Sequence, residues 1–196
     1  MILKEDLEIQ VKNIFSLAWN ARKGIVVPND RSISLGNNGV ELNATVLYAD
    51  LSKSTNLVDN YAPEFAAEIY KAYLLCAAKI IRNQGGEITA YDGDRIMAVF
   101  IGEKKNTSSV KAALKINYAV RSIINPAIAK QYGEGKYSVN HVVGIDTSSL
   151  LVAKTGVRGA NDLVWVGRAA NYAAKLSSLP NFPTYITHSI AILNDL

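Results

Sequence analysis

The segment 92–94, Asp-Gly-Asp, separates two short runs of strand-forming residues, 87–91 and 95–101. Asp-Gly is a strong signal for a tight hairpin, because these residue types adopt the positive φ angles that such turns require. Residues 63–83, which precede the hairpin, carry apolar side chains at helical spacing. A long helix followed by a tight hairpin indicates a fold in which helices pack on antiparallel strands.

The other elements are predicted from hydrophobic periodicity and from turn residues. We predict helices over residues 2–22, 63–83, 108–125 and 168–179. We predict strands over residues 32–35, 44–52, 87–91, 95–101, 137–146, 150–156, 163–167 and 184–190. This order predicts an α+β fold, with a mainly antiparallel, ferredoxin-like sheet and helices packed on one of its faces.

Particular residues mark the expected ends of the helices. Gly85-Gly86 is expected to end the second helix, and Pro126 is expected to end the third. Ser54 or Thr55 is expected to cap a helix that follows the first core strand.

The chain has 196 residues, enough for one domain of roughly 150 residues and an appendage. The core is expected to begin at Leu42, just before the first long apolar strand. We therefore expect residues 1–41 to form an N-terminal helix and connector, and residues 42–196 to form a single domain.

Composition and charge exclude several classes of protein. Hydrophobic residues make up 49% and charged residues 19% of the chain, as in globular proteins. Charges interrupt residues 1–20, and no apolar run approaches the ~18 residues of a membrane span, so we expect neither a signal peptide nor direct membrane insertion. The net charge is only +4 and the basic residues are scattered, which predicts no nucleic-acid partner. The single cysteine, Cys76, fits a reducing cytoplasm.

Two aspartates are the strongest candidates for chemistry. Asp50 ends the strand over 44–52 and Asp94 lies in the hairpin, so pairing of these elements would bring both carboxylates to one edge of the sheet. Like charges repel at close range, and a divalent cation such as Mg²⁺ or Mn²⁺ removes that repulsion. Two such ions, typically ~4 Å apart, can activate an attacking oxygen and neutralise a leaving diphosphate. The alternative is structural: Asp94 only builds the turn, and Asp50 only caps a helix.

Three segments resemble, in the same order, the motifs of class III nucleotide cyclases. They are ATVLYADLSKST at 44–55, YDGDRIMAVF at 91–100 and VWVGRAANYAAKL at 164–176. The resemblance covers essentially everything after residue 42, and it implies that 42–196 form a cyclase catalytic domain. Such domains convert a nucleoside triphosphate into its 3′,5′-cyclic monophosphate and diphosphate.

The resemblance also implies roles for residues of the first two motifs. Asp50 and Asp94 would bind two Mn²⁺ or Mg²⁺ ions per site, with the backbone carbonyl of Leu51 as a further ligand. The amides that follow Asp50 would hold the β- and γ-phosphates at the start of the next helix. The phosphate-binding residues expected on this basis are Ser52, Ser54 and Thr55.

In the third motif, Asn171 would orient the ribose and Lys175 would stabilise charge on the triphosphate. Class III cyclases usually have arginine where this chain has Lys175, and lysine lacks the bidentate fork of a guanidinium. Lys175 can also be an ordinary surface lysine. The two halves of each family site come from different subunits, so the resemblance implies a homodimer with composite active sites.

Two positions argue against a purine substrate. Adenylate and guanylate cyclases read the base with polar side chains where this chain has Ala90 and Val164, neither of which can form a side-chain hydrogen bond. Tyr48 and Arg95 are the candidates for contacting a smaller base. The alternatives are core packing for Tyr48 and a solvated charge for Arg95.

Residues 19–35, WNARKGIVVPNDRSISL, together with the following LYADLSKST, resemble the pyrimidine cyclases of bacterial Pycsar anti-phage systems. This resemblance implies a substrate of UTP or CTP, with UTP slightly favoured. It also implies a separate effector that the cyclic nucleotide activates. Two other hypotheses remain open: a divergent adenylate cyclase, and an inactive cyclase-fold module for nucleotide binding or dimerisation.

Overall fold

A computed structural model of the chain describes residues 3–192. Its strands form one sheet in the order β3-β4-β2-β5-β6, with β1 added in parallel to β2 and β7 in parallel to β5. The strands are β1 (Asn20–Lys23), β2 (Asn38–Leu51), β3 (Glu87–Asp92), β4 (Arg95–Phe100), β5 (His141–Val157), β6 (Ala160–Val166) and β7 (Thr184–Ile186). The central strand pairs are antiparallel, as predicted.

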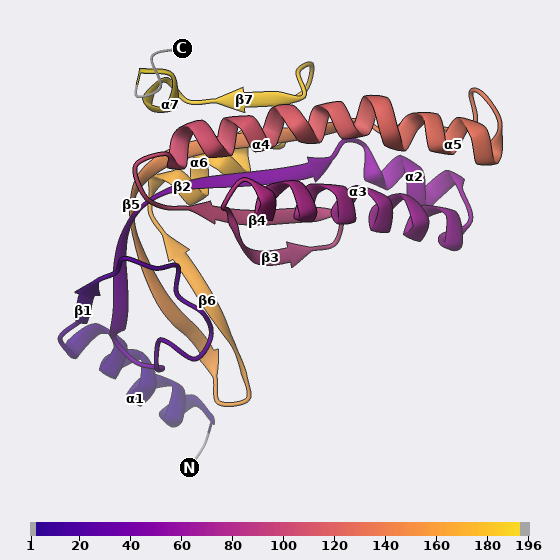
Figure 1. Ribbon diagram of the computed structural model, residues 1–196. Helices are drawn as coiled ribbons and strands as arrows, with labels where there is room; N and C mark the ends of the chain where they lie inside the picture. Colours follow the sequence, from indigo (N-terminus) through magenta and orange to yellow (C-terminus); the bar gives the residue numbers. More distant parts are fainter. Residues whose placement is uncertain (1–2, 193–196) are drawn as a thin grey trace.

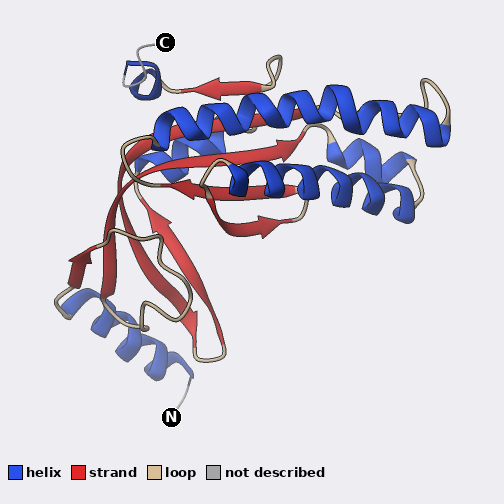
Figure 2. Ribbon diagram, viewed as in Figure 1, coloured by secondary structure: helices blue, strands red, loops and turns tan. Residues whose placement is uncertain are grey.

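The helices are α1 (Leu3–Ser16), α2 (Ser54–Asn60), α3 (Pro63–Asn83), α4 (Lys105–Ala119), η1 (Val120–Ile124), α5 (Asn125–Tyr132), α6 (Arg168–Leu176) and α7 (His188–Ile192). The element η1 is a π-helical turn. Figure 2 shows the two long strands β2 and β5 at the centre of the molecule, with α3 and α4 over the sheet and α5 continuing the long helix beyond the strand ends.

Side-chain alternation along β2 creates a core on each face of the sheet. Leu47 and Ala49 are fully buried on the face that α3 and α4 cover. Val46 is fully buried on the other face, in a cluster that includes Ala170 and Ala173 of α6. The α+β class and the antiparallel sheet are confirmed, but α6 lies on the face opposite to α3 and α4.

Gly144 of β5 is the reason that α6 can lie so close to the sheet. A Cβ atom at this position would lie 2.1 Å from the carbonyl oxygen of Ala173 and 2.5 Å from the amide nitrogen of Ser177. Only a residue without a side chain leaves room for this contact.

The prediction that a helix ends near Pro126 was wrong. The helix runs from α4 through η1 into α5 without a break (Figure 1). Proline lacks an amide hydrogen and clashes with the preceding turn of a regular helix. Here Pro126 lies in the first turn of α5, directly after the wider π turn, where the missing hydrogen bond costs little.

Several other boundaries also differ from the predictions. The first helix ends at Ser16, and residues 20–23 form β1 instead of a continuation of that helix. Residues 32–35 form bends and no strand. The strands predicted at 137–146 and 150–156 are one strand, β5, which begins only at His141, because the residues between them pair with β2 without interruption.

The last strand is also shorter than predicted. β7 covers only Thr184–Ile186, and the residues from His188 onward form α7. The helices predicted over 63–83 and from residue 168, and the hairpin of β3 and β4, are confirmed. The division of the chain at residue 42 stays a prediction.

Candidate active site

The sheet brings Asp50 and Asp94 to one edge, as the sequence predicted. β2 and β4 are antiparallel neighbours, and Ala49 pairs with Ile96. Asp50 is therefore one residue beyond this pair on β2, and Asp94 two residues before it in the turn between β3 and β4.

The surroundings of this acid pair disfavour two negative charges. Burial, and next the charge of Asp94, raise the pKa of Asp50 from 3.8 to about 6. The Oδ2 atom of Asp94 is buried and accepts no hydrogen bond from the described residues. A buried carboxylate oxygen without a partner is costly, so the pair fits a cation as its missing partner.

The donor set fits a small, hard ion. Within residues 3–192, no group of three or more His, Cys, Asp and Glu side chains is placed to hold a metal. The pair offers two carboxylates, and the backbone of Leu51 follows Asp50 directly. Mg²⁺ typically binds through one or two carboxylates and completes its shell with substrate phosphates and water. The site therefore suits ions that are held jointly with a phosphorylated substrate.

Three of the four predicted base-pocket residues lie together beside the acid pair. Met97 of β4 pairs with Tyr48 on one side and with Ala90 on the other, so these residues form a row across three strands. The guanidinium of Arg95 lies 5.3 Å from the centre of the Tyr48 ring. It also forms a 2.7 Å ion pair with Asp92, while its Nε is buried with no acceptor among the described residues.

Val164, the fourth, lies elsewhere in the protomer. It is on β6, at the opposite edge of the strand order from β3, which carries Ala90. Four strand spacings separate these edges, or about 19 Å. The side chain of Val164 is 39% exposed, so one protomer alone does not bring Ala90 and Val164 into one pocket.

The residues expected to bind phosphate follow β2. The structure corrects the predicted cap, because Lys53 occupies the N-cap position of α2 and no side chain caps the helix. The chain enters the helix through a left-handed conformation at Lys53, with φ at 60°. This places Ser54 inside the first turn, followed by Thr55. The backbone amide of Ser52 donates to the carbonyl oxygen of Asn140 at 2.8 Å, so it is not free to donate to a phosphate.

Asn171 and Lys175 lie one turn apart on α6. Ala169, Ala170 and Ala173 of this helix are buried against the sheet, whereas Asn171 and Lys175 are exposed. Neither side chain forms a hydrogen bond or ion pair with Asp50 or Asp94 within the described part of the chain. The structure therefore presents these two residues on an outer surface, separate from the acid pair.

Comparison with known proteins assigns the family. No family model matches the sequence. A uridylate cyclase of Xanthomonas perforans is 56% identical over 191 residues, covering 97% of this chain and 83% of that protein. A uridylate cyclase of Burkholderia cepacia is 52% identical over 192 residues, covering 97% and 83%. The chain belongs to the uridylate cyclase family.

The fold of this uridylate cyclase family member is also that of the purine cyclases. The crystal structure of the adenylyl cyclase CyaB from P. aeruginosa superposes with a TM-score of 0.70 at 22% identity, covering 79% of this chain and 81% of that one. The class III cyclase fold is thus confirmed. No helix within residues 3–192 is long and apolar enough to cross a membrane.

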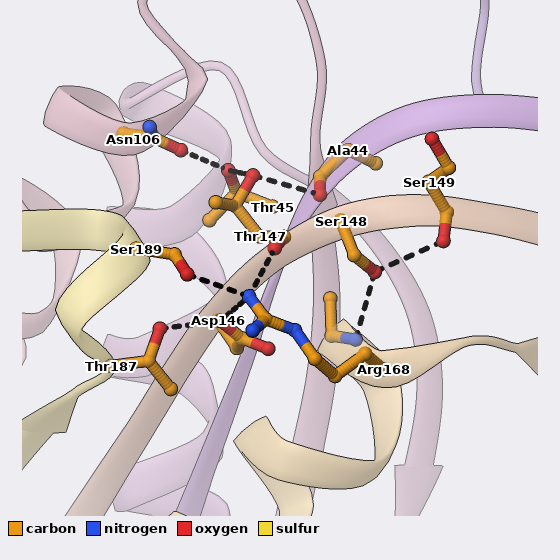
Figure 3. A network of polar contacts seen from close by, with 11 residues as sticks. Ala44, Thr45, Asn106, Asp146, Thr147, Ser148, Ser149, Arg168, Thr187 and Ser189 are labelled. Carbon is orange, nitrogen blue, oxygen red and sulfur yellow. Dashed lines mark hydrogen bonds and ion pairs between the residues drawn. The ribbon is translucent and has the colours of Figure 1, made fainter. Parts of the chain in front are cut away.

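In this uridylate cyclase family member, a polar network around the buried Asp146 holds the start of α6 (Figure 3). Asp146 of β5 is completely buried, and its Oδ1 accepts a hydrogen bond from Arg168 at 3.2 Å. Arg168 also donates to the carbonyl oxygen of Thr147 and, at 2.7 Å, to Ser189. Thr187 donates to Asp146 as well. This network fixes the helix that carries Asn171 and Lys175 to β5 and to the segment around α7.

Sequence reasoning missed two cations near the acid pair. Lys53 and Arg121 line the same cavity as Asp50. Lys53 lies inside the first motif, over residues 44–55, and could have been identified from the sequence. No sequence pattern indicated Arg121 as a site residue, because it lies within a predicted helix. It lines this cavity from the π turn η1.

Proposed function

We propose that this chain converts UTP to 3′,5′-cyclic UMP and diphosphate. The observation that carries the proposal is the acid pair, Asp50 and Asp94, held at the end of β2 with an unpartnered buried oxygen. Relatives named uridylate cyclase, at 52–56% identity, support the choice of substrate.

The proposed reaction is an in-line displacement at the α-phosphorus. The ribose 3′-oxygen forms the new bond to phosphorus and loses its proton to solvent, and the bond to the diphosphate oxygen breaks. Two Mn²⁺ or Mg²⁺ ions would be held by Asp50, Asp94 and the carbonyl of Leu51, and divalent ions at such sites activate the attacking oxygen and neutralise the leaving group. The backbone around Ser54 and Thr55 would bind the β- and γ-phosphates, as the family resemblance implies.

The catalytic unit we propose is a symmetric homodimer with composite sites. The positions of Ala90 and Val164 support it, because these residues lie on opposite edges of one sheet. The exposure of Asn171 and Lys175 supports it as well. In the dimer, Asn171 of the partner subunit would orient the ribose, and Lys175 of the partner subunit would stabilise charge on the triphosphate.

The base pocket we propose contains Tyr48, Ala90 and Arg95, with the partner subunit's Val164 closing it. Arginine only donates hydrogen bonds. Uracil presents a carbonyl oxygen where cytosine presents an amino group, so a free donor on Arg95 favours UTP over CTP. The buried Nε of Arg95, which has no acceptor among the described residues, supports this choice.

The biological role is inferred from the family resemblance. Cyclic UMP would act as a second messenger in anti-phage defence by activating a separate effector protein. We propose a cytoplasmic location, where nucleoside triphosphates are available and Cys76 would stay reduced.

Turnover of UTP tests the proposed activity. The purified protein is incubated with Mn²⁺ and each of UTP, CTP, ATP and GTP separately, and the products are read by mass spectrometry beside Asp50→Asn and Asp94→Asn. We expect cyclic UMP and diphosphate from the wild type and neither from the two variants. Cyclic UMP from both variants would contradict the assigned site. No product from any triphosphate would favour a nucleotide-binding or dimerisation module instead.

A further inference from the structure

The basic residues of this chain are scattered in sequence but concentrated in one helical layer of the fold. Segments 69–86 and 104–133, which hold most of α3 and all of α4, η1 and α5, contain nine of the 21 basic residues and none of the 17 acidic residues. The rest of the chain, with 12 basic and 17 acidic residues, is net negative. The modest net charge of +4 therefore conceals a strong separation of charge.

Helical spacing brings six of these cations to one exposed surface, here called the basic face. On α3 they recur at intervals of three or more residues, opposite the buried Tyr73 and Ala77. On α4 they lie opposite the buried Ala113 and Ile116. The two helices pack against each other and on the same face of the sheet (Figure 1), so their exposed sides point away from the sheet together. The basic face consists of six exposed residues: Lys71, Lys79, Arg82, Lys104, Lys111 and Lys115.

The protein itself does not neutralise the basic face. Within residues 3–192, none of its six cations forms an ion pair. The acids of α3, Glu64 and Glu68, lie in its first two turns, at the opposite end from Arg82. Glu68 accepts a hydrogen bond from Tyr132. Neighbouring cations without counter-charges repel one another, so the basic face favours an anionic partner.

Large apolar side chains are exposed among these cations. Leu75 lies one turn from Lys71 and one turn from Lys79, and Leu114 and Tyr118 lie one turn apart on α4. Each of these three apolar side chains is more than half exposed. The partner is therefore expected to offer both negative charge and an apolar region that these side chains can enter.

This composition favours a lipid surface over nucleic acid. Five of the six cations are lysines, which act on phosphate as point charges, whereas arginine supplies the bidentate contacts with which proteins read nucleic acids. Leucine gains little against a polynucleotide backbone, but it enters the headgroup region of a bilayer, where tyrosine is also enriched. No residue of the basic face lines the cavity beside Asp50, and an outer surface of two helices suits a planar partner.

We propose that the basic face docks this protein on the surface of a membrane rich in anionic lipids. The lysines and Arg82 would lie at the level of the lipid phosphates, and Leu75, Leu114 and Tyr118 would enter the headgroup region. Such binding needs no membrane-spanning segment. It is independent of the proposed cyclase activity, because none of these residues belongs to the acid pair, the base pocket or the third motif.

Sedimentation of the full chain with lipid vesicles tests this docking. The vesicles consist of phosphatidylcholine alone, or of phosphatidylcholine and phosphatidylglycerol in equal parts. One double variant, Lys71→Gln with Lys79→Gln, removes two cations from α3. A second, Lys111→Gln with Lys115→Gln, removes two cations from α4. Thermal unfolding confirms that each variant is folded.

Two further double variants separate the contributions of apolar contact and of general charge. Leu75→Gln with Leu114→Gln keeps the cations and removes apolar side chains. Lys12→Gln with Lys23→Gln, at exposed lysines outside the basic face, is the charge-matched control. Binding of a DNA duplex, measured by fluorescence anisotropy, is the second probe, because nucleic acid is the competing partner.

We expect the wild type to sediment with the anionic vesicles and not with phosphatidylcholine alone, and added salt to weaken this binding. Each double lysine variant of the basic face should lower the partition coefficient by about 25-fold, or about fivefold for each cation removed. The leucine variant should also bind the anionic vesicles more weakly, and the control should bind like the wild type.

Three results would overturn the proposal. The first is a wild type that does not bind anionic vesicles. The second is vesicle binding that both lysine variants of the basic face retain, or that the control loses to the same extent. The third is binding to the DNA duplex that is tighter than binding to vesicles and that the leucine variant leaves unchanged, which would assign the basic face to nucleic acid.

Discussion

Asp50 lies beside Asp94 at the edge of the sheet, and burial together with this neighbouring carboxylate raises the pKa of Asp50 to about 6. The acid pair is thus a source of instability in the protein without bound cations. Repulsion between the two carboxylates destabilises the site without a cation, and a bound cation removes that repulsion. Metal-assisted phosphoryl chemistry requires a site of this kind.

The first prediction concerns stability against pH for Asp50→Asn. The folded-state pKa of Asp50 is above its ordinary value of 3.8, so its contribution to stability is present below about pH 4 and is lost as the pH rises through 6. Asparagine at this position does not ionise, so its contribution to stability is not lost as the pH rises. Without divalent ions, we expect Asp50→Asn to be more stable than the wild type at pH 8, on the order of 1 kcal/mol once solvent screening is allowed for, and equal to it near pH 4.

Urea unfolding at both pH values in EDTA measures this difference. Asp59→Asn, at an exposed acid of α2, is the control and should change little at either pH. An equal gain in both variants at pH 8 would mean that general charge, and not the pairing of Asp50 with Asp94, is responsible.

The second prediction concerns subunit mixing. Asp50→Ala damages the metal half of the proposed site, and Asn171→Ala damages the half that orients the ribose. Each variant alone should be inactive. In an equal mixture, half of the dimers are mixed and each has one intact site, so activity should return to about a quarter of the wild-type value. A mixture that stays inactive, after exchange is verified by mass spectrometry, would contradict composite sites.

The third prediction concerns Gly144→Ala. The added methyl group would lie 2.1 Å from the carbonyl oxygen of Ala173 and would displace α6 from the sheet. We expect a loss of about 1–3 kcal/mol in stability and a large loss of activity, because Asn171 and Lys175 move with the helix. Mn²⁺ binding at the acid pair should persist. Gly159→Ala, where no atom lies within 4 Å but φ is +87°, is the control for backbone strain without a clash, and it should lower stability without displacing α6 or reducing activity.

The fourth prediction concerns Arg168, whose guanidinium pairs with a completely buried carboxylate. Arg168→Met leaves Asp146 without its cation and is expected to reduce stability by about 3 kcal/mol. The double variant with Asp146→Asn should recover much of this loss, because the uncompensated charge is gone. Urea unfolding of the two single variants and the double variant measures the coupling. Purely additive losses would show that the pair is not energetically linked.

Local signals were sufficient where one short segment determines the structure. The Asp-Gly turn, the apolar strand that carries Asp50 near its end and the periodic helix over 63–83 are all present in the structure. Pairing of β2 with β4 then brings Asp50 and Asp94 together, because their strands are neighbours. The acid pair was therefore predictable from sequence.

Features that depend on distant contacts were not predictable in this way. The polar residues Thr147, Ser148 and Ser149 suggested a break in β5, but they remain in the strand because it pairs with β2 without interruption over residues 141–153. Pro126 suggested a helix end, but the π turn before it accommodates the ring. The cavity with Lys53 and Arg121 joins segments almost 70 residues apart, so no local pattern indicates it.

One competition experiment tests the central claim most directly. The protein is given ATP, GTP, CTP and UTP together at equal concentrations with Mn²⁺, and the cyclic nucleotides are quantified by mass spectrometry. With Ala90 and Val164 in place of purine-reading side chains, and Arg95 as a hydrogen-bond donor, cyclic UMP should be the main product. Cyclic AMP or cyclic GMP as the main product would contradict the account.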